Sequence, residues 1–528
     1  MKWRIAGLVL ILAVAASAAT DWSAEGKRWW AHVQYLADDK LEGRETGSEG
    51  HRQAAAYVVA EFEKAGLGPA GTSGYFQPIA FSVRQIDEEH SRLELVRQGR
   101  AEPMQLGEDA VFSMRCNPAE QMEAPAVFVG YGLRIPEAQY DDLAGLDLRG
   151  KIAVFLSGGP PQIPGPLKAH YSSTGERWKA LEKAGAAGMA VIPNPNSMDI
   201  PWPRLALSRF SPQMELADPA LQETRGMKFY VLINPARADR FFRGTTHTMA
   251  QILKAANAGK PVPRFPLAAG FRARVAVKHS AVESPNVTGL LTGSDPRLKE
   301  EYVVLTAHLD HVGVGQPING DRIYNGAMDD ASGVASLLEI ARAFHESGAR
   351  PKRSLIFLAV TGEEKGLLGS KYFAAHPTVQ GRKIVADINM DMFLPLHALR
   401  YLEVQGLNES SLGDDIRAVA QQAGVEVQAD KEPERNLFIR SDQYSFIRKG
   451  IPALAFKFGY VKGSREEKLH KEWLRTRYHA PSDDVNQPVD QAAAAQFNHI
   501  LYELTRRVGD SPARPQWKPD SFFRRFAD

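Results

Sequence analysis

The sequence predicts an α/β fold, with a mixed, mostly parallel sheet, helices on both faces and an inserted β-rich domain. From residue 271 onward, short apolar runs alternate with helical patterns, as in α/β sheets. Between residues 91 and 269 the pattern changes to short strands separated by Gly and Pro. The 528 residues include 44% hydrophobic and 24% charged side chains, which is a globular composition with room for several domains.

Residues 1–19 have the pattern of a secretory signal peptide. Lys2 and Arg4 precede an apolar run, and a small-residue cleavage site follows at 16–18. The run is shorter than the roughly 20 residues that span a bilayer, which disfavours the alternative of a membrane anchor. We therefore expect an exported protein, periplasmic or extracellular, without stable membrane association. The single Cys116 excludes an intrachain disulfide, and this favours a bacterial periplasm or exterior.

The charge balance excludes some classes of partner. Lys and Arg total 64 and Asp and Glu total 62, so the net charge is +2. Nothing in this balance indicates nucleic acid or an anionic membrane as a partner. One cysteine also excludes a cysteine-rich zinc fold.

The helices and strands are expected in the following order. Apolar residues at helical spacing, with Gly66 as a stop, predict a helix over 53–64. A second helix is predicted over 332–347, ended by Gly348. We divide the chain into a signal peptide at 1–19, a first part of the main domain at 20–90, an insert at 91–269, a second part at 270–510 and a tail at 511–528. Strands are predicted over 126–129, 152–156, 188–192, 302–305, 355–360, 384–388 and 453–458.

Acidic and histidine side chains gather where the predicted strands end. His308, the pair Glu363 and Glu364, and Asp391 each follow an apolar strand. Asp329 lies at the start of the 332–347 helix, and His479 precedes a Pro turn. Ligands of open α/β sheets gather at the carboxyl ends of strands, so these groups are expected to converge.

Two imidazoles and several carboxylates suit zinc. Four ligands would close a structural site, whereas five indicate two metals that share one carboxylate and keep a position for water. Of the adjacent Glu363 and Glu364, one can bind metal while the other acts as general base. Asp310 lies two residues after His308, and on an extended segment its carboxylate would accept a hydrogen bond from that ring. Four other histidines receive no role: His311, His345, His376 and His470.

These residues resemble the co-catalytic dizinc exopeptidases, which include secreted bacterial leucyl aminopeptidases and glutamate carboxypeptidase. The matching motifs lie at 307–310, 326–333, 361–364, 389–392 and 478–483. The resemblance extends over 22–90 and 271–508 and implies the zinc-exopeptidase (phosphorylase/hydrolase-like) fold.

The resemblance also implies a role for each residue. His308 and Asp391 would bind one Zn²⁺, and Glu364 and His479 the other. Asp329 would bridge the two ions, with a cis bond to Asp330. Two further residues are implied as catalytic: Glu363 as general base and Asp310 as the partner of His308.

The middle region resembles a protease-associated domain, for which packing and substrate contact are equally open roles. One departure from the family lies at Gln443, where a histidine is common. Nearby Phe438, Arg440 and Tyr444 are candidates for a specificity pocket.

The resemblance implies a secreted metallo-exopeptidase that cleaves peptide substrates, with an aminopeptidase as the first expectation. A carboxypeptidase of the glutamate carboxypeptidase type, acting on a C-terminal acidic residue, is the first alternative. It would need cations converging on the substrate carboxylate, for which Arg322, Arg440 and Lys457 are candidates. Single-zinc glutaminyl cyclisation is the second alternative. A non-catalytic binding module on the same fold is the third, disfavoured because the ligand set and the base are complete.

Overall fold

The computed structural model describes residues 21–198, 200–379, 383–435 and 437–527. The predicted signal peptide at 1–19 lies outside these ranges. Within them, every helix is too short or too polar to cross a bilayer.

The larger lobe is built on a mixed sheet with strand order β19-β18-β20-β17-β13-β16-β12. β13 pairs in parallel with β16 and β17, and β17 pairs in parallel with β20. β12 and β18 join this group in antiparallel orientation, and β19 is parallel to β18. The predicted mixed, mostly parallel sheet is therefore confirmed. The strands are β13 (Tyr302–His308), β16 (Ser354–Val360), β17 (Ile384–Asn389), β18 (Tyr401–Gln405), β19 (Glu426–Ala429) and β20 (Ala453–Phe458).

Helices cover both faces of this sheet, because successive strand side chains point to opposite sides. Val303 and Leu305 of β13 pack in one core with α1, α2, α8 and α13. Val304 faces the other way and packs with Phe373 of α9 and Phe446 of α11. The helices of the larger lobe are α1 (Ser23–Leu36), α2 (Glu49–Lys64), α8 (Ser332–Ser347), α9 (Leu368–Ala375), α10 (Leu412–Gln422), α11 (Gln443–Ile447), α12 (Arg465–Thr476) and α13 (Gln491–Asp510).

Helix α8 has the bounds that the sequence predicts. Its apolar side, including Leu337, Leu338 and Phe344, is buried against the sheet. Gly348 ends it with φ 65°, a left-handed conformation that glycine adopts without a steric penalty. Helix α2 begins four residues earlier than expected, because the side chain of Ser48 accepts a hydrogen bond from the His51 N–H and caps it there.

The smaller lobe holds most of residues 98–263 and has its own core around Phe128, Phe229 and Phe271. β5, β8, β9 and β11 run parallel in that order, and β4 closes the edge in antiparallel orientation. Its main elements are β3 (Arg100–Met104), β4 (Ala110–Phe112), β5 (Gln121–Val129), β8 (Ile152–Leu156), α3 (Gly165–Ser172), α4 (Thr174–Lys183), β9 (Gly188–Ile192), β10 (Gln213–Leu216), β11 (Tyr230–Ile233), α6 (Asp239–Phe242) and α7 (Met249–Asn257).

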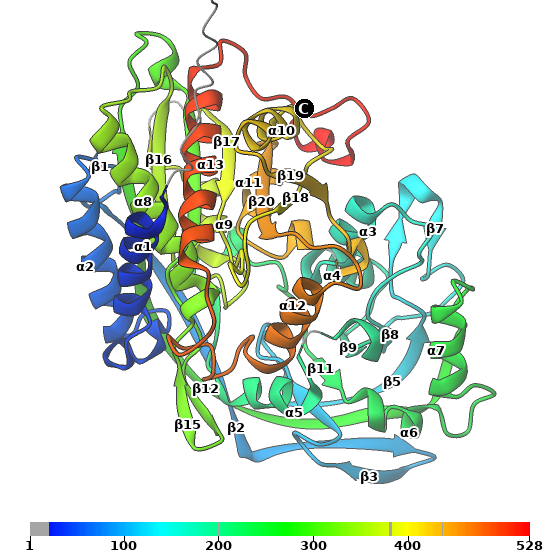
Figure 1. Cartoon of the computed structure of the whole chain (residues 1–528). Helices are drawn as coiled ribbons and strands as arrows, with labels where there is room; N and C mark the ends of the chain where they lie inside the picture. The colour runs from blue at the N-terminus through cyan, green and yellow to red at the C-terminus, as the bar shows by residue number, and fades with distance from the viewer. Residues whose placement is uncertain (1–20, 199, 380–382, 436, 528) are drawn as a thin grey trace, which may run out of the picture.

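Two long strands join the lobes. β2 (Phe76–Arg97) and β12 (Arg264–Leu291) pair in antiparallel orientation from Phe76↔Val287 to Val96↔Gly270. Figure 1 shows them running along the base of the molecule from the larger lobe into the smaller one. The domain boundaries expected after residues 90 and 269 fall inside these strands. β12 pairs with β16 near its end and with β5 near its start, so both lobes are hydrogen-bonded to the same strand.

The C-terminal tail is better ordered than its Pro- and Arg-rich composition suggests. Phe523 is fully buried and Trp517 nearly so, in a cluster with Phe438 and Ile447. The indole N–H of Trp517 donates to the backbone oxygen of Gly450 at 2.8 Å. Burying these aromatic rings anchors the tail to the larger lobe.

Candidate metal centre

The predicted ligands converge at the carboxyl edge of three neighbouring parallel strands. His308 is the last residue of β13, Asp391 follows β17, and Glu363 and Glu364 follow β16. Two further residues reach the same point from other elements: Asp329 from the turn before α8, and His479 from the loop after α12. The structure therefore brings the five predicted ligands and Glu363 to one site.

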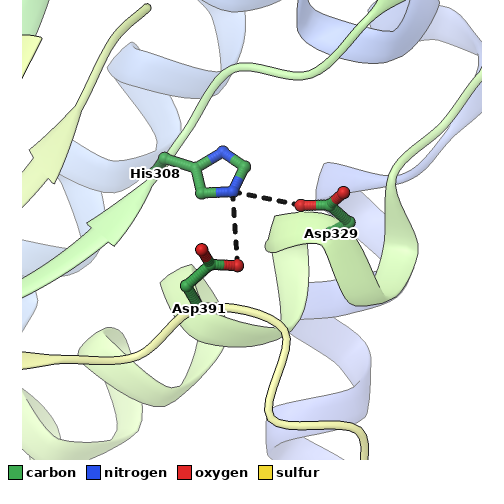
Figure 2. Close-up of side chains that lie close together, drawn as sticks. All are labelled: His308, Asp329 and Asp391. Atoms are coloured by element: carbon green, nitrogen blue, oxygen red, sulfur yellow. Dashed lines mark ion pairs between the residues drawn. The ribbon is translucent and has the colours of Figure 1, made fainter. Parts of the chain in front are cut away.

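One cluster consists of His308, Asp329 and Asp391 (Figure 2). Nε2 of His308 lies 3.1 Å from Oδ1 of Asp329 and 3.7 Å from Oδ1 of Asp391. The Nδ1–H of the same ring donates to the backbone oxygen of Asp310 at 2.9 Å. A carbonyl oxygen only accepts, so this bond leaves the lone pair of Nε2 in the neutral ring facing the carboxylates.

A second cluster shares Asp329. Nε2 of His479 lies 3.3 Å from Oδ2 of Asp329 and 3.1 Å from Oε2 of Glu364. The two oxygens of Asp329 therefore face different histidines, Oδ1 towards His308 and Oδ2 towards His479. The Asp329–Asp330 peptide bond is cis, as the resemblance implied.

His311, which received no role from the sequence, is a member of the second cluster. Its ring is fully buried, and Nδ1 lies 2.8 Å from Oε1 of Glu364 and 4.0 Å from Oδ2 of Asp329. Glu364 thus has one carboxylate oxygen towards His311 and the other towards His479. The only signal for this in the sequence is the position of His311, three residues after His308.

The Asp310 carboxylate was expected to accept a hydrogen bond from the His308 ring, but among the described residues the ring bonds the Asp310 backbone oxygen instead, so that expectation is wrong. β13 ends at His308, so the chain is no longer extended at Asp310 and the two side chains do not share a face. The carboxylate of Asp310 accepts instead from Thr46 Oγ1 at 3.0 Å and from the Glu363 N–H at 3.1 Å. Asp310 thus holds His308 through its backbone and the Glu363 main chain through its side chain.

Buried polar side chains fix the loops that carry the ligands. The guanidinium of Arg44, fully buried, donates to the backbone oxygens of Leu309, Asn325 and Gly326 at 2.7–3.0 Å. Asp483 accepts from the Asp329 N–H at 3.1 Å. A charged group that satisfies several backbone groups at once rigidifies the loops between them.

Asp330, next to the shared carboxylate, ties three ligand loops together. Its carboxylate accepts backbone N–H bonds from His308 at 3.1 Å, Gly333 at 3.0 Å and Met392 at 3.2 Å. The segments around the first cluster are therefore held by a side chain that does not itself belong to that cluster.

The donor set fits a cation. The His308 Nε2, Asp329 Oδ2 and Glu364 Oε1 atoms are buried and make no hydrogen bond with any described residue. A nitrogen lone pair and carboxylate oxygens this close repel one another unless a cation lies between them. Imidazole nitrogen and carboxylate oxygen are ordinary zinc ligands.

The carboxylates also control the titration of their neighbours. Burial lowers the pKa of His479, but Glu364 and Asp329 outweigh it and raise this pKa to about 10. Burial raises the pKa of Glu363 well above its usual range, and Glu364 and Asp391 add to this effect. A carboxyl group with a raised pKa is suited to accept a proton from a reacting water.

Gln443, where the family commonly has histidine, is a buried structural residue. Its Oε1 accepts from Asn389 Nδ2 at 2.8 Å, and its Nε2 donates to the Phe438 oxygen at 3.1 Å. It therefore links the end of β17 to the loop before α11.

The centre opens into a cleft of about 1010 Å³ between the lobes. Glu363, Glu364 and His479 of the metal centre line it, together with residues from the smaller lobe that include Arg177 and Glu223. Of the predicted specificity residues, Arg440 and Tyr444 line this cleft. Phe438 is instead buried in the cluster that anchors the tail.

The segment that carries this site is similar to known proteins. The model of Peptidase family M28 matches residues 286–505. Carboxypeptidase Q of Xenopus laevis is 33% identical over 123 residues, which cover 23% of this chain and 24% of that protein. A probable leucine aminopeptidase 2 of Aspergillus oryzae is 28% identical over 262 residues, which cover 46% of this chain and 48% of that protein. The chain thus spans about a quarter to a half of the length of these relatives.

Among solved structures, an aminopeptidase from Aneurinibacillus sp. strain AM-1 has the same fold. The two share a TM-score of 0.56 and 20% identity over 94% of this chain and 97% of that one. The family match begins within β12 and includes every residue of the two clusters. Over the segment that forms this centre, the chain therefore resembles the zinc peptidases of Peptidase family M28, as its motifs predicted.

Proposed function

We propose that the chain is a dizinc exopeptidase, and specifically an exported aminopeptidase that removes N-terminal residues from peptides. His308 and Asp391 would hold one Zn²⁺, Glu364 and His479 the other, and Asp329 would bridge them. The observation that carries this proposal is the position of Asp329, whose two oxygens face histidines of different clusters. A shared carboxylate of this kind is what a two-metal hydrolytic site requires.

The proposed mechanism assigns the proton transfers to the chain's own residues. When bound, zinc supplies Lewis acidity towards a carbonyl oxygen and lowers the pKa of water. Glu363 accepts the proton of the attacking water and then donates it to the leaving amine. Asp310 supports both partners, because its carboxylate holds the Glu363 main chain and its carbonyl oxygen orients the His308 ring.

The choice of an aminopeptidase follows the names of similar proteins. The Aspergillus and Aneurinibacillus relatives are described as aminopeptidases. Export follows from the pattern at 1–19, and the smaller lobe is proposed to be a protease-associated insert that shapes the wall of the cleft. Its exposed Lys179 and Arg225 line the cleft, which supports contact with the substrate. Its Glu223 instead forms ion pairs with Lys371 and Arg448 of the larger lobe, which is a packing role.

One observation favours the carboxypeptidase as a second candidate. Of the three cations that could receive a substrate carboxylate, Arg440 and Lys457 line the same small recess beside Asp391. Arg322 lies elsewhere, exposed on β15 (Asp321–Tyr324).

Zinc content of the purified protein, measured together with peptide hydrolysis, tests the proposal. We expect two zincs per chain and cleavage restricted to substrates with a free amino group. Two zincs with cleavage from the carboxyl end of N-blocked peptides would support the carboxypeptidase instead. One zinc without peptide hydrolysis would point to the cyclase, and absence of bound metal would contradict an enzyme of this class.

A further inference from the structure

A small recess lies directly beside the metal centre. Its volume is about 60 Å³, about that of two liquid waters at roughly 30 Å³ each. Asp391, Glu363 and His479 of the metal centre are among the residues that line it. A substrate group that enters the recess would therefore lie next to the bond that the proposed reaction cleaves.

Three cations line the same recess: Arg435, Arg440 and Lys457. Arg435 makes an ion pair with Glu432 at 2.6 Å, and Arg440 is exposed. The carboxylates of Asp329, Glu363 and Asp391 also line the recess, but they belong to the proposed zinc site and its base. The charged residues of the recess that are not assigned to the zinc site are all cations.

Lys457 is the cation that the fold leaves without a counter-ion. It lies on β20 and is half-buried, yet its ammonium makes no hydrogen bond or ion pair with any described residue. Glu403 stands opposite it on β18. That carboxylate instead accepts a hydrogen bond from Gln405 at 2.9 Å. Burial, together with Arg435 and Arg440, lowers the pKa of Lys457.

A half-buried ammonium group without a counter-ion loses hydration and gains nothing in return within the protein. A carboxylate that entered the recess would supply the missing partner and would meet Arg440 as well. Charge-assisted contacts of this kind are among the stronger polar interactions.

We infer that the recess is a carboxylate subsite, built around Lys457 and Arg440, that selects substrates with an acidic group next to the scissile bond. The inference rests on the proposed peptidase function and names its substrate class. The carboxylate could belong to an N-terminal Asp or Glu side chain or to the C-terminus of the peptide. The two sources share their chemistry, and the assay below separates them.

Steady-state kinetics on matched substrates provide the first test. For a side-chain carboxylate, we expect kcat/KM for the 4-nitroanilide of glutamate to exceed that of glutamine, its neutral isostere, by about tenfold or more. For a C-terminal carboxylate, N-acetyl-Ala-Glu and N-acetyl-Ala-Leu would both be cleaved, whereas their C-terminal amides would not. Equal rates for glutamate and glutamine, combined with no cleavage of the blocked dipeptides, would overturn the inference.

Variants then assign the effect to the recess. Lys457→Met should remove the preference for the acidic substrate, and Lys457→Arg should retain most of it. Lys462→Met removes an exposed lysine five residues away and should change nothing. Circular dichroism checks folding. Should Lys457→Met fail to fold, Arg440→Gln tests the same recess from an exposed position and should also reduce the preference.

A binding measurement separates this inference from the proposed function. For a side-chain carboxylate, calorimetry should show that the zinc-loaded protein binds L-glutamate about tenfold more tightly than L-glutamine, and Lys457→Met should abolish the difference. If leucine 4-nitroanilide is cleaved, glutamate has no advantage in rate or binding, and the blocked dipeptides are not cleaved, the subsite is wrong and the peptidase stands. If glutamate binds selectively but no peptide is cleaved, the subsite stands and the peptidase is wrong.

Discussion

Replacing His311 with asparagine should weaken one zinc site and leave the other intact. The ring contacts Oε1 of Glu364 at 2.8 Å and is fully buried, whereas the first cluster consists of His308, Asp329 and Asp391. Asparagine is too short to reach the carboxylate, so Glu364 loses the contact that fixes its orientation.

The size of the effect follows from that contact. Loss of a residue that orients a ligand typically weakens metal binding by about 10–100-fold. We therefore expect the dissociation constant of the Glu364 and His479 site to rise by about 10–100-fold, with no change at the site of His308 and Asp391.

Competition against a chelator of known affinity, in a stepwise zinc titration, measures both constants. The wild type should show two tight steps and His311→Asn one tight and one weakened step. His170→Asn is the matched control, because His170 is also buried but bonds Tyr444 at 2.7 Å, outside both clusters. Two unchanged steps in His311→Asn would refute the reasoning. Equal weakening of both steps would show a general loss of structure instead.

Three further predictions concern the base, the shared ligand and pH. Glu363→Gln should keep the wild-type zinc content by elemental analysis and lose about 10²–10⁴-fold in kcat; unchanged turnover would remove Glu363 from the role of base. Asp329→Ala should lose both metals, and retention of two tightly bound zincs would contradict its bridging position. Burial raises the pKa of Glu403 to about 7 from 4.5. This carboxyl holds its proton more tightly in the folded chain, so its contribution to stability is lost as pH rises from about 4.5 through 7. Glu403→Gln should therefore be more stable than wild type at pH 8, by about 1–3 kcal/mol in urea unfolding, and equally stable at pH 4. If the stability of both proteins depends on pH in the same way, Glu403 is not the source of that dependence.

The candidate ligands could be predicted because most of them lie next to a feature that the sequence itself indicates, such as the end of a strand or the start of a helix. His308 and Asp391 follow mainly apolar runs that are typical of buried strands, and parallel strands bring their carboxyl ends to one edge. His311 was missed because it follows the end of β13, where the chain turns irregularly and spacing no longer determines direction. The same turn explains why the Asp310 carboxylate bonds Thr46 and Glu363 instead of His308.

Sequence patterns could not predict contacts between segments that are far apart in the chain. In the sequence Arg44 belongs to a polar loop, yet its side chain is fully buried and donates hydrogen bonds to backbone oxygens more than 260 residues away. Lys457 could be named as a candidate for a substrate carboxylate, but only the pairing of β18 with β20 shows that its neighbour Glu403 does not neutralise it. Such features depend on tertiary geometry and leave no periodic signal.

The shared strands β2 and β12 determine how the protein can be dissected. Excising residues 91–269, the expected insert, would cut β2 within the ladder that runs from Phe76↔Val287 to Val96↔Gly270 and would leave residues 270–274 of β12 without their partners. The stumps would carry unpaired N–H and C=O groups, which are templates for aggregation. A truncated protein that fails to fold would therefore reveal nothing about the part that the smaller lobe plays in substrate choice. Point substitutions at exposed residues of the smaller lobe that line the cleft, such as Lys179 or Arg225, leave the ladder whole and are the sound way to ask that question.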